Sequence, residues 1–383
     1  MTRPNSRLRA RASVDVPAPR EADEPVSPES VTPPAAPPAA VPSTSAWRQS
    51  PGRVAGHVAR TYSLPILLVV SVLIYSLWGG GVSTAFNSAA SWRNIAAGQA
   101  VTGVLTLGIL ITLVSGNFDL SIGNICGLSS VMSAAAYANW HLSLIPGLLI
   151  GVAIGAAVGG MNGFLSTTLR VDPFIITLGT ASVILGFVDW YTKGTSIING
   201  IPTSLIDFGR TNFLGIPEVA WVLAVVALLI YYLLEHTPYG RALHAIGSNR
   251  AAAKLVGIRV ERTITSAFAL TGAFAGVAGI LLLAYTGSGN PTIGPTFTLT
   301  ALASAFLGAV SFKVGRLNVP GTIVAIFFLS INITGLTYAG VQNWITEVFT
   351  GLTLILAVAL AAVLSKERKA KRSTTTEQTR NPA

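Results

Sequence analysis

The sequence predicts an all-α polytopic membrane protein of about ten transmembrane helices, and three observations support this fold class. Hydrophobic residues make up 51% of the 383 positions and charged residues only 10%, whereas a soluble domain has about 25% charged residues. The hydrophobic residues fall into separate runs, each near the roughly 20 residues that a helix needs to cross a bilayer. The Lys and Arg residues, finally, concentrate in every second connection between these runs.

Residues 1–60 precede the first run, and we expect them to form a disordered cytoplasmic tail. They are rich in Pro, Ala, Ser and charged residues, and such a composition buries too little apolar surface to offset the entropy of ordering. A signal peptide is not expected, because the first apolar run starts late and lacks a small-residue cleavage site. The membrane domain is expected to span 61–365, and residues 366–383 a basic cytoplasmic tail.

Ten runs are long enough to be predicted as spans. Gly and polar residues crowd the starts of the third and the eighth, which could therefore be broken or re-entrant helices. The predicted spans lie at about 63–80, 95–115, 119–139, 143–168, 173–192, 218–235, 263–286, 297–312, 319–338 and 344–364.

The distribution of basic residues predicts the orientation. With the N-terminus inside, all but three of the 25 Lys and Arg residues fall in inner segments, and the exceptions are Arg93, Lys193 and Arg210. The asymmetry persists without the long tail, which the positive-inside rule discounts. Both termini are therefore expected in the cytoplasm, and the net charge of +10 needs no nucleic-acid partner to explain it.

Two short matches suggest an inverted repeat. Gly116-Asn117 is matched by Gly289-Asn290, and Ile145-Pro146-Gly147 by Val319-Pro320-Gly321. The copies are five spans apart, so they would enter the membrane in opposite senses, as in many transporters.

The polar segment 235–262 interrupts the hydrophobic sequence and must lie in water, because lipid does not accept that much charge. Its middle predicts a short helix over 250–256, with Ser248 or Asn249 as the N-cap and Gly257 as the left-handed stop. We expect this helix to be a docking surface. The segment holds five basic residues: Arg241, Arg250, Lys254, Arg259 and Arg262.

Polar residues near the predicted spans are candidates for a pore or a gate. Asn117 and Asp119 lie between the second and third spans, where Asp119 would either accept backbone N–H groups at a helix start or contribute to gating. Asn162, Thr177 and Thr180 belong to the fourth and fifth spans. Each would either bond to a neighbouring helix or line a path for a polar solute.

A glycine stripe in the fourth span predicts close helix packing. One glycine recurs every four residues, which gives a smooth helix face that another helix can approach. The stripe consists of Gly147, Gly151, Gly155, Gly159 and Gly163.

Motifs of enzymes are missing from the sequence. It contains no P-loop, no H-E-x-x-H, no C-x-x-C and no G-x-S-x-G, so we expect neither a nucleotide site of the P-loop type nor a metal or other cofactor on this chain. Acidic residues lie at the ends of spans, whereas an ion- or proton-coupled secondary transporter usually carries them in mid-span. A secondary transporter acting alone is therefore the alternative rather than the leading hypothesis.

Three stretches resemble the permease subunits of bacterial ribose-type (monosaccharide) ABC importers, over about residues 65–365. Two of the stretches are similar to family signatures, and they read GNFDLSIGNICGLSS and NGFLSTTLRVDPFIITLGT. TPYGRALHAIGSNRAAAKLVGIRV resembles the family's cytoplasmic coupling loop. The chain departs from the family in FLGAVSFKVGRLNVPGT, where Gly308-Ala309 replaces a Gly-Gly pair and Lys313 and Arg316 interrupt a Gly-rich run.

The resemblance implies a transport subunit in the bacterial cytoplasmic (inner) membrane. Its partners would be an ABC-type ATPase that binds ATP and Mg²⁺, a second permease, identical or related, and an extracytoplasmic solute-binding protein. It implies that residues 235–262 are the coupling loop that docks on the ATPase. The implied coupling residues are Gly240, Arg241, Gly247, Asn249, Arg250 and Gly257.

Overall fold

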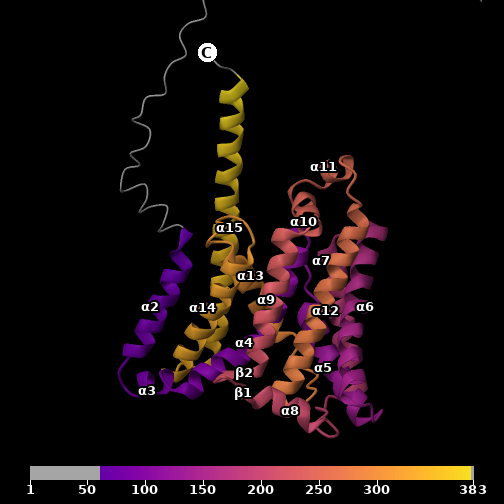
Figure 1. Cartoon of the computed structure of the whole chain (residues 1–383), viewed down its shortest axis with the longest axis vertical. Helices are drawn as coiled ribbons and strands as arrows, with labels where there is room; N and C mark the ends of the chain where they lie inside the picture. The colour runs from indigo at the N-terminus through magenta and orange to yellow at the C-terminus, as the bar shows by residue number, and fades with distance from the viewer. Residues whose placement is uncertain (1–60, 381–383) are drawn as a thin grey trace, which may run out of the picture. The chain divides into compact units, whose positions relative to one another are not determined.

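The described structure is a bundle of α-helices whose chain direction alternates from one apolar helix to the next, the short ones included (Figure 1). The computed structural model describes residues 61–380, all of which belong to one compact unit, Ser50–Ala383. The predicted tail 1–60 and the last three residues of the predicted tail 366–383 lie outside the described residues.

Seven described helices are long and apolar enough to cross a membrane, by length and composition. Three more are apolar but shorter. Each predicted run contains one of these helices, which confirms a multi-pass membrane protein, while ten complete crossings remain a prediction because three of the helices are short. The seven are α4 (Ala89–Val114), α6 (Leu144–Leu169), α7 (Pro173–Thr192), α9 (Glu218–His236), α12 (Val260–Thr286), α14 (Val319–Tyr338) and α15 (Asn343–Arg380); the three are α2 (Ser63–Leu77), α5 (Ile122–Ala138) and α13 (Thr296–Gly308).

Small elements lie at the two ends of the bundle (Figure 1). One end carries α3 (Val82–Phe86), α8 (Thr203–Arg210) and the antiparallel pair β1 (Asn212–Phe213) and β2 (Ile216–Pro217). The other end carries α10 (Pro238–Ser248) and α11 (Arg250–Leu255).

Several predicted boundaries shift in the structure. α4 begins at Ala89 rather than near residue 95, because the Ser88 hydroxyl caps it by accepting a hydrogen bond from the Ser91 amide at 3.1 Å. α12 begins at Val260, inside the predicted polar segment. α15 continues as helix to Arg380, through most of the predicted tail 366–383.

Helix α4 is the centre of the bundle, since every residue from Ala100 to Val114 is buried. A helix buried on every side has no solvent-facing stripe. It contacts α9, α12, α13 and α14. Together with α4 they form the main hydrophobic core, and three smaller clusters of buried residues lie beside it in the described part of the chain.

The glycine stripe of α6 lies mainly against α12. A Cβ on Gly155 would overlap the carbonyl oxygen of Gly272, and one on Gly159 would overlap that of Phe268. Gly163 faces Thr265 in the same way. Backbone therefore meets backbone along this interface, as small residues permit between membrane helices. Gly147 faces Tyr137 of α5, and Gly151 lies between Ser133 of α5 and Ile280 of α12.

Candidate functional site

A chain of side-chain hydrogen bonds joins three of the predicted pore or gating residues. Asp119 Oδ1 accepts from the backbone N of Ser121 at 2.9 Å and from its Oγ at 2.6 Å. Asn162 Nδ2 on α6 donates to Ser121 Oγ at 2.9 Å, and Thr180 Oγ1 on α7 donates to Asn162 Oδ1 at 2.6 Å. The chain thus ties the turn before α5 to α6 and α7.

Two further contacts hold the start of α5 against α7. The backbone N of Leu120 donates to Thr177 Oγ1 at 3.1 Å, and Asn124 Nδ2 donates to the carbonyl oxygen of Ala181 at 2.9 Å. Sequence reasoning missed Ser121 and Asn124, although both lie in the polar start of the third span. We call Asp119, Ser121, Asn124, Asn162, Thr177 and Thr180 the α5 anchor.

The α5 anchor is mostly buried, so in this conformation it positions helices rather than lining an open path. Asp119, Asn162 and Thr177 are fully buried. The bond from the Ser121 amide agrees with the interpretation of Asp119 as a helix-start residue, with Ser121 itself at the N-cap position. Asn117 lies apart and donates to Ser115 O at 3.2 Å and Ser115 Oγ at 2.7 Å.

The predicted eighth span, 297–312, contains one unbroken but short helix, and the segment before it is not helical. Residues 287–295 run without helix along α5, and α13 follows with only 13 residues. A Cβ on Gly289 would lie 2.7 Å from Ala134 Cβ, and one on Gly294 would lie 2.9 Å from Gly127 Cα. The non-helical segment therefore extends along part of the length of α5 that the short helix α13 does not reach.

Polar side chains of the non-helical segment 287–295 lie on its exposed side. Asn290 Oδ1 accepts from Thr292 N at 2.8 Å and Thr292 Oγ1 at 3.0 Å, and both Thr292 and Thr296 are exposed. Sequence analysis did not select these residues, although Pro291 and Pro295 interrupt the apolar pattern there. Transport sites often lie where the helices of a membrane protein are interrupted, so residues 287–295 are a second candidate site next to the α5 anchor.

The polar segment 235–262 forms two helices rather than the single predicted one. α10 packs closely, since a Cβ on Gly240 would overlap carbonyl oxygens at the end of α9 and one on Gly247 would overlap that of Val114 at the end of α4. α11 follows as predicted: Asn249 Oδ1 accepts from the Ala252 amide at 3.0 Å, and Gly257 adopts φ +86°. Gly240 and Gly247 are thus packing positions that mount α11 on the bundle.

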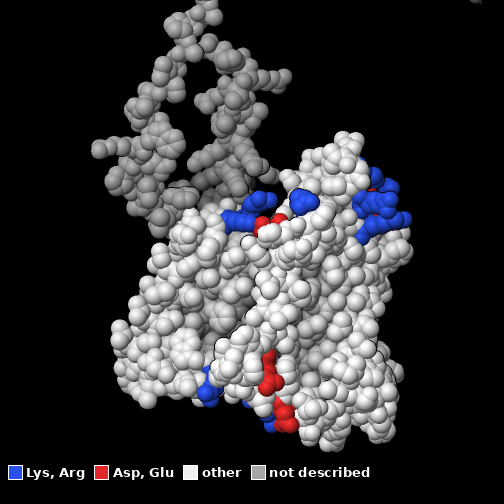
Figure 2. Space-filling model, viewed as in Figure 1, with Lys and Arg blue, Asp and Glu red and all other residues white. Residues whose placement is uncertain are grey.

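The tip of α11 presents apolar side chains in a basic surrounding. Leu255 is 88% exposed and Val256 is 76% exposed. Arg250 and Lys254 are exposed on the same short helix, and Figure 2 shows basic side chains gathered at this end of the bundle. An exposed apolar tip with a charged rim is typical of a protein interaction site.

A polar cavity of about 740 Å³ separates α11 from the turn between α6 and α7. Thr167 lines it from the end of α6 and Arg170 from the turn, and Arg250 and Lys254 line it from α11. Lys254 Nζ lies 3.3 Å from Glu261 Oε1 at the start of α12. Across this cavity α11 faces the ends of α6 and α7, the helices that carry Asn162, Thr177 and Thr180 of the α5 anchor.

An ion pair connects the end of α9 to the loop before α14. Lys313 Nζ lies 2.5 Å from Glu235 Oε2. Burial lowers the pKa of the neighbouring His244 on α10, and the positive charges of Arg316 and Lys313 lower it further against the opposing effect of Glu235. His244, Glu235, Lys313 and Arg316 therefore form one electrostatic cluster.

Most of this chain is similar in sequence to known proteins. A family model described as the permease component of the branched-chain amino acid transport system matches residues 92–358. The ribose import permease protein RbsC of Bacillus subtilis is 33% identical over 294 residues, which cover 76% of this chain and 90% of that protein.

Two other relatives carry different transport names. The galactose/methyl galactoside import permease protein MglC of Haemophilus influenzae is 31% identical over 301 residues, covering 74% of this chain and 90% of that protein. The autoinducer 2 import system permease protein LsrD of Yersinia enterocolitica is 32% identical over 264 residues, covering 67% and 78%. No solved structure matches the chain. The extent of the family match and of these identities shows that the chain belongs to this family of transport permease components.

Proposed function

We propose that the chain is the permease subunit of an ATP-binding-cassette importer that moves a monosaccharide or a similar polar solute into a bacterial cell. The names of its relatives support this solute class, since they are import permeases for ribose, for galactose or methyl galactoside, and for autoinducer 2. The chain is a transport component and not an enzyme, and ATP and Mg²⁺ would bind to a separate ATPase. The observation that carries the proposal is the exposed apolar tip of α11 on a closely packed mount.

The mount explains how a docked ATPase would move the membrane helices. α11 follows directly on α10, whose Gly247 contacts the end of α4 and whose Gly240 contacts the end of α9. Because these contacts join backbone to backbone, a displacement of α10 cannot be absorbed by side-chain rotation alone. Different affinities of the two ATPase states for α11 would then bias the arrangement of α4 and α9.

The solute path is proposed along the non-helical segment 287–295 that precedes α13. Asn290, Thr292 and Thr296 supply hydrogen-bonding groups suited to sugar hydroxyls, and they are at least partly exposed. The α5 anchor would keep α5, along which this segment runs, fixed relative to α6 and α7. A second permease and an extracytoplasmic solute-binding protein, the latter at the end that carries α3 and α8, would complete the assembly in the inner membrane.

The topology of the proposal keeps ten crossings, an inverted repeat and both termini in the cytoplasm. The alternating directions of the apolar helices support it (Figure 1).

Leu255→Asp tests the docking role. A charge on the apolar tip is expected to weaken binding of the partner ATPase by about tenfold or more, the scale of a central interface residue, and to reduce uptake in proteoliposomes to the same extent. Leu255→Met is the matched control, because it keeps an apolar side chain and should leave both intact. Unchanged ATPase binding in Leu255→Asp would contradict the proposal, as would transport by the purified chain without any ATPase.

A further inference from the structure

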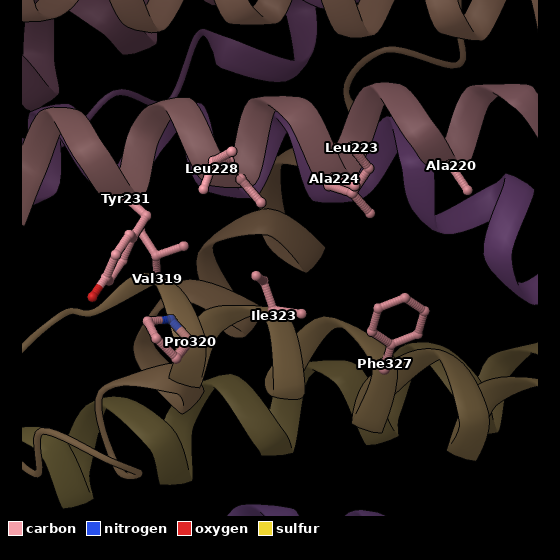
Figure 3. Close-up of a pocket in the computed structure, with 10 residues that line it drawn as sticks. Ala220, Leu223, Ala224, Leu228, Tyr231, Val319, Pro320, Ile323 and Phe327 are labelled. Carbon is pink, nitrogen blue, oxygen red and sulfur yellow. The ribbon is translucent and has the colours of Figure 1, made fainter.

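An apolar groove of about 530 Å³ separates α9 from α14 (Figure 3). Ala224 and Leu228 line it from α9, and Ile323 and Phe327 line it from α14. In the close-up these side chains face one another across the gap, with Tyr231 and Pro320 at one end and Ala220 and Phe327 at the other. The family's transport role does not account for this groove.

The groove lies at membrane depth and opens sideways. Both of its helices are among those long and apolar enough to cross a bilayer, and Leu228 on its wall is 69% exposed. The Tyr231 hydroxyl is the one side-chain polar group among the residues that line this groove. A hydrated solute would lose its hydrogen bonds there, so the groove fits an apolar chain.

One end of the groove carries a positive charge. Glu235 lies one turn beyond Tyr231 on the same face of α9, and Lys313 pairs with it at 2.5 Å while its own side chain stays 49% exposed. The exposed Arg316 belongs to the same loop, which leads directly into Val319 at the start of α14. The two positive charges of Lys313 and Arg316 thus exceed the single negative charge of Glu235 at this end of the groove.

We propose that the groove holds an acyl chain of an anionic phospholipid whose phosphate group contacts Lys313 and Arg316. Basic pockets between membrane helices on the cytoplasmic side are suited to anionic head groups. An acyl chain gains little hydrophobic free energy on leaving the surrounding lipid, since both environments are apolar. The charges of Lys313 and Arg316 therefore set the lipid selectivity, and the groove sets the place where the acyl chain lies.

Native mass spectrometry of the purified full chain tests this site, with phosphatidylglycerol and phosphatidylcholine of identical acyl chains as probes. The wild type is expected to retain phosphatidylglycerol preferentially through delipidation. A basic side chain near an anionic lipid surface contributes a factor of about five in affinity. Arg316→Gln and Lys313→Gln should each reduce the preference by about that factor, whereas Lys193→Gln at the opposite end should not.

A second pair of variants tests the groove itself. Ala224→Trp fills the space between α9 and α14 and is expected to lower retention of both lipids, whereas Leu229→Trp, on an exposed neighbouring position outside the groove lining, should leave retention unchanged. Equal retention in all variants would overturn the proposal. Loss of a dimer in Ala224→Trp without loss of lipid would instead assign the groove to a second copy of the chain. The readout is lipid binding, so the result does not depend on the proposed transport function.

Discussion

Replacing Gly155 by alanine tests the packing of α6 on α12 at its closest point. The added Cβ would overlap the carbonyl oxygen of Gly272 and would lie 3.0 Å from the backbone N and 3.1 Å from the Cα of Gly276. Carbon atoms prefer separations of about 3.5–4.0 Å. All three neighbours are backbone atoms, so the two helices must move apart to accommodate the methyl group.

The matched control is Gly160→Ala on the same helix. Its Cβ would meet Ala269 Cβ at 3.5 Å, which is ordinary van der Waals contact. Both variants gain the same helix preference of alanine over glycine, about 1 kcal/mol, so this effect cancels when they are compared. What remains is the overpacking at Gly155, about 1–3 kcal/mol.

Thermal unfolding in detergent, followed by circular dichroism, measures the difference. Gly155→Ala is expected to unfold at a lower temperature than Gly160→Ala, and Gly160→Ala should be at least as stable as the wild type. Equal stability of the two alanine variants would show that α6 and α12 do not approach as closely as described, and the reasoning on backbone contact would fail.

Three further substitutions test other parts of the structure. Asn162→Leu removes the partner of Ser121 and Thr180 and should cost about 1–3 kcal/mol of unfolding free energy, measured by the same melting assay; an unchanged melt would contradict the α5 anchor. Asn249→Ala removes the cap of α11 and should cost about 1 kcal/mol locally, seen as faster amide exchange confined to α11. Burial and Arg316 lower the pKa of His244 below its usual 6.5, so the unfolded chain binds more protons than the folded one below that pH. Stability should therefore be complete above about pH 6.5 and decrease below it, and His244→Gln should flatten this decrease in melting temperature; an identical pH profile would refute it.

The sequence alone predicted the features that depend on local composition. The ten apolar runs and the uneven distribution of Lys and Arg predicted a multi-pass membrane protein, because the cost of placing charge in lipid acts on each residue separately. The stop at Gly257 was also predicted correctly, and the cap was narrowed to Ser248 or Asn249, of which the structure has Asn249. Both depend on residues within one turn of the helix end.

Other features required the tertiary structure. No local pattern says that Asp119, Asn162 and Thr180, which belong to three separate segments, share hydrogen bonds through Ser121. The glycine stripe predicted a close neighbour, but only the fold identified α12 as that neighbour. The roles of Gly240 and Gly247 likewise became clear only when the ends of α9 and α4 were placed beside them.

The physical reason for this division is the range of the interactions. Hydrophobic run length, charge exclusion and helix capping act along the chain, so the sequence by itself determined the class of the protein and the position of α11. Side-chain hydrogen bonds and backbone contacts between helices act across the bundle, where partners are separated by many residues. Only the tertiary structure decided which polar groups meet, and where a groove remains between α9 and α14.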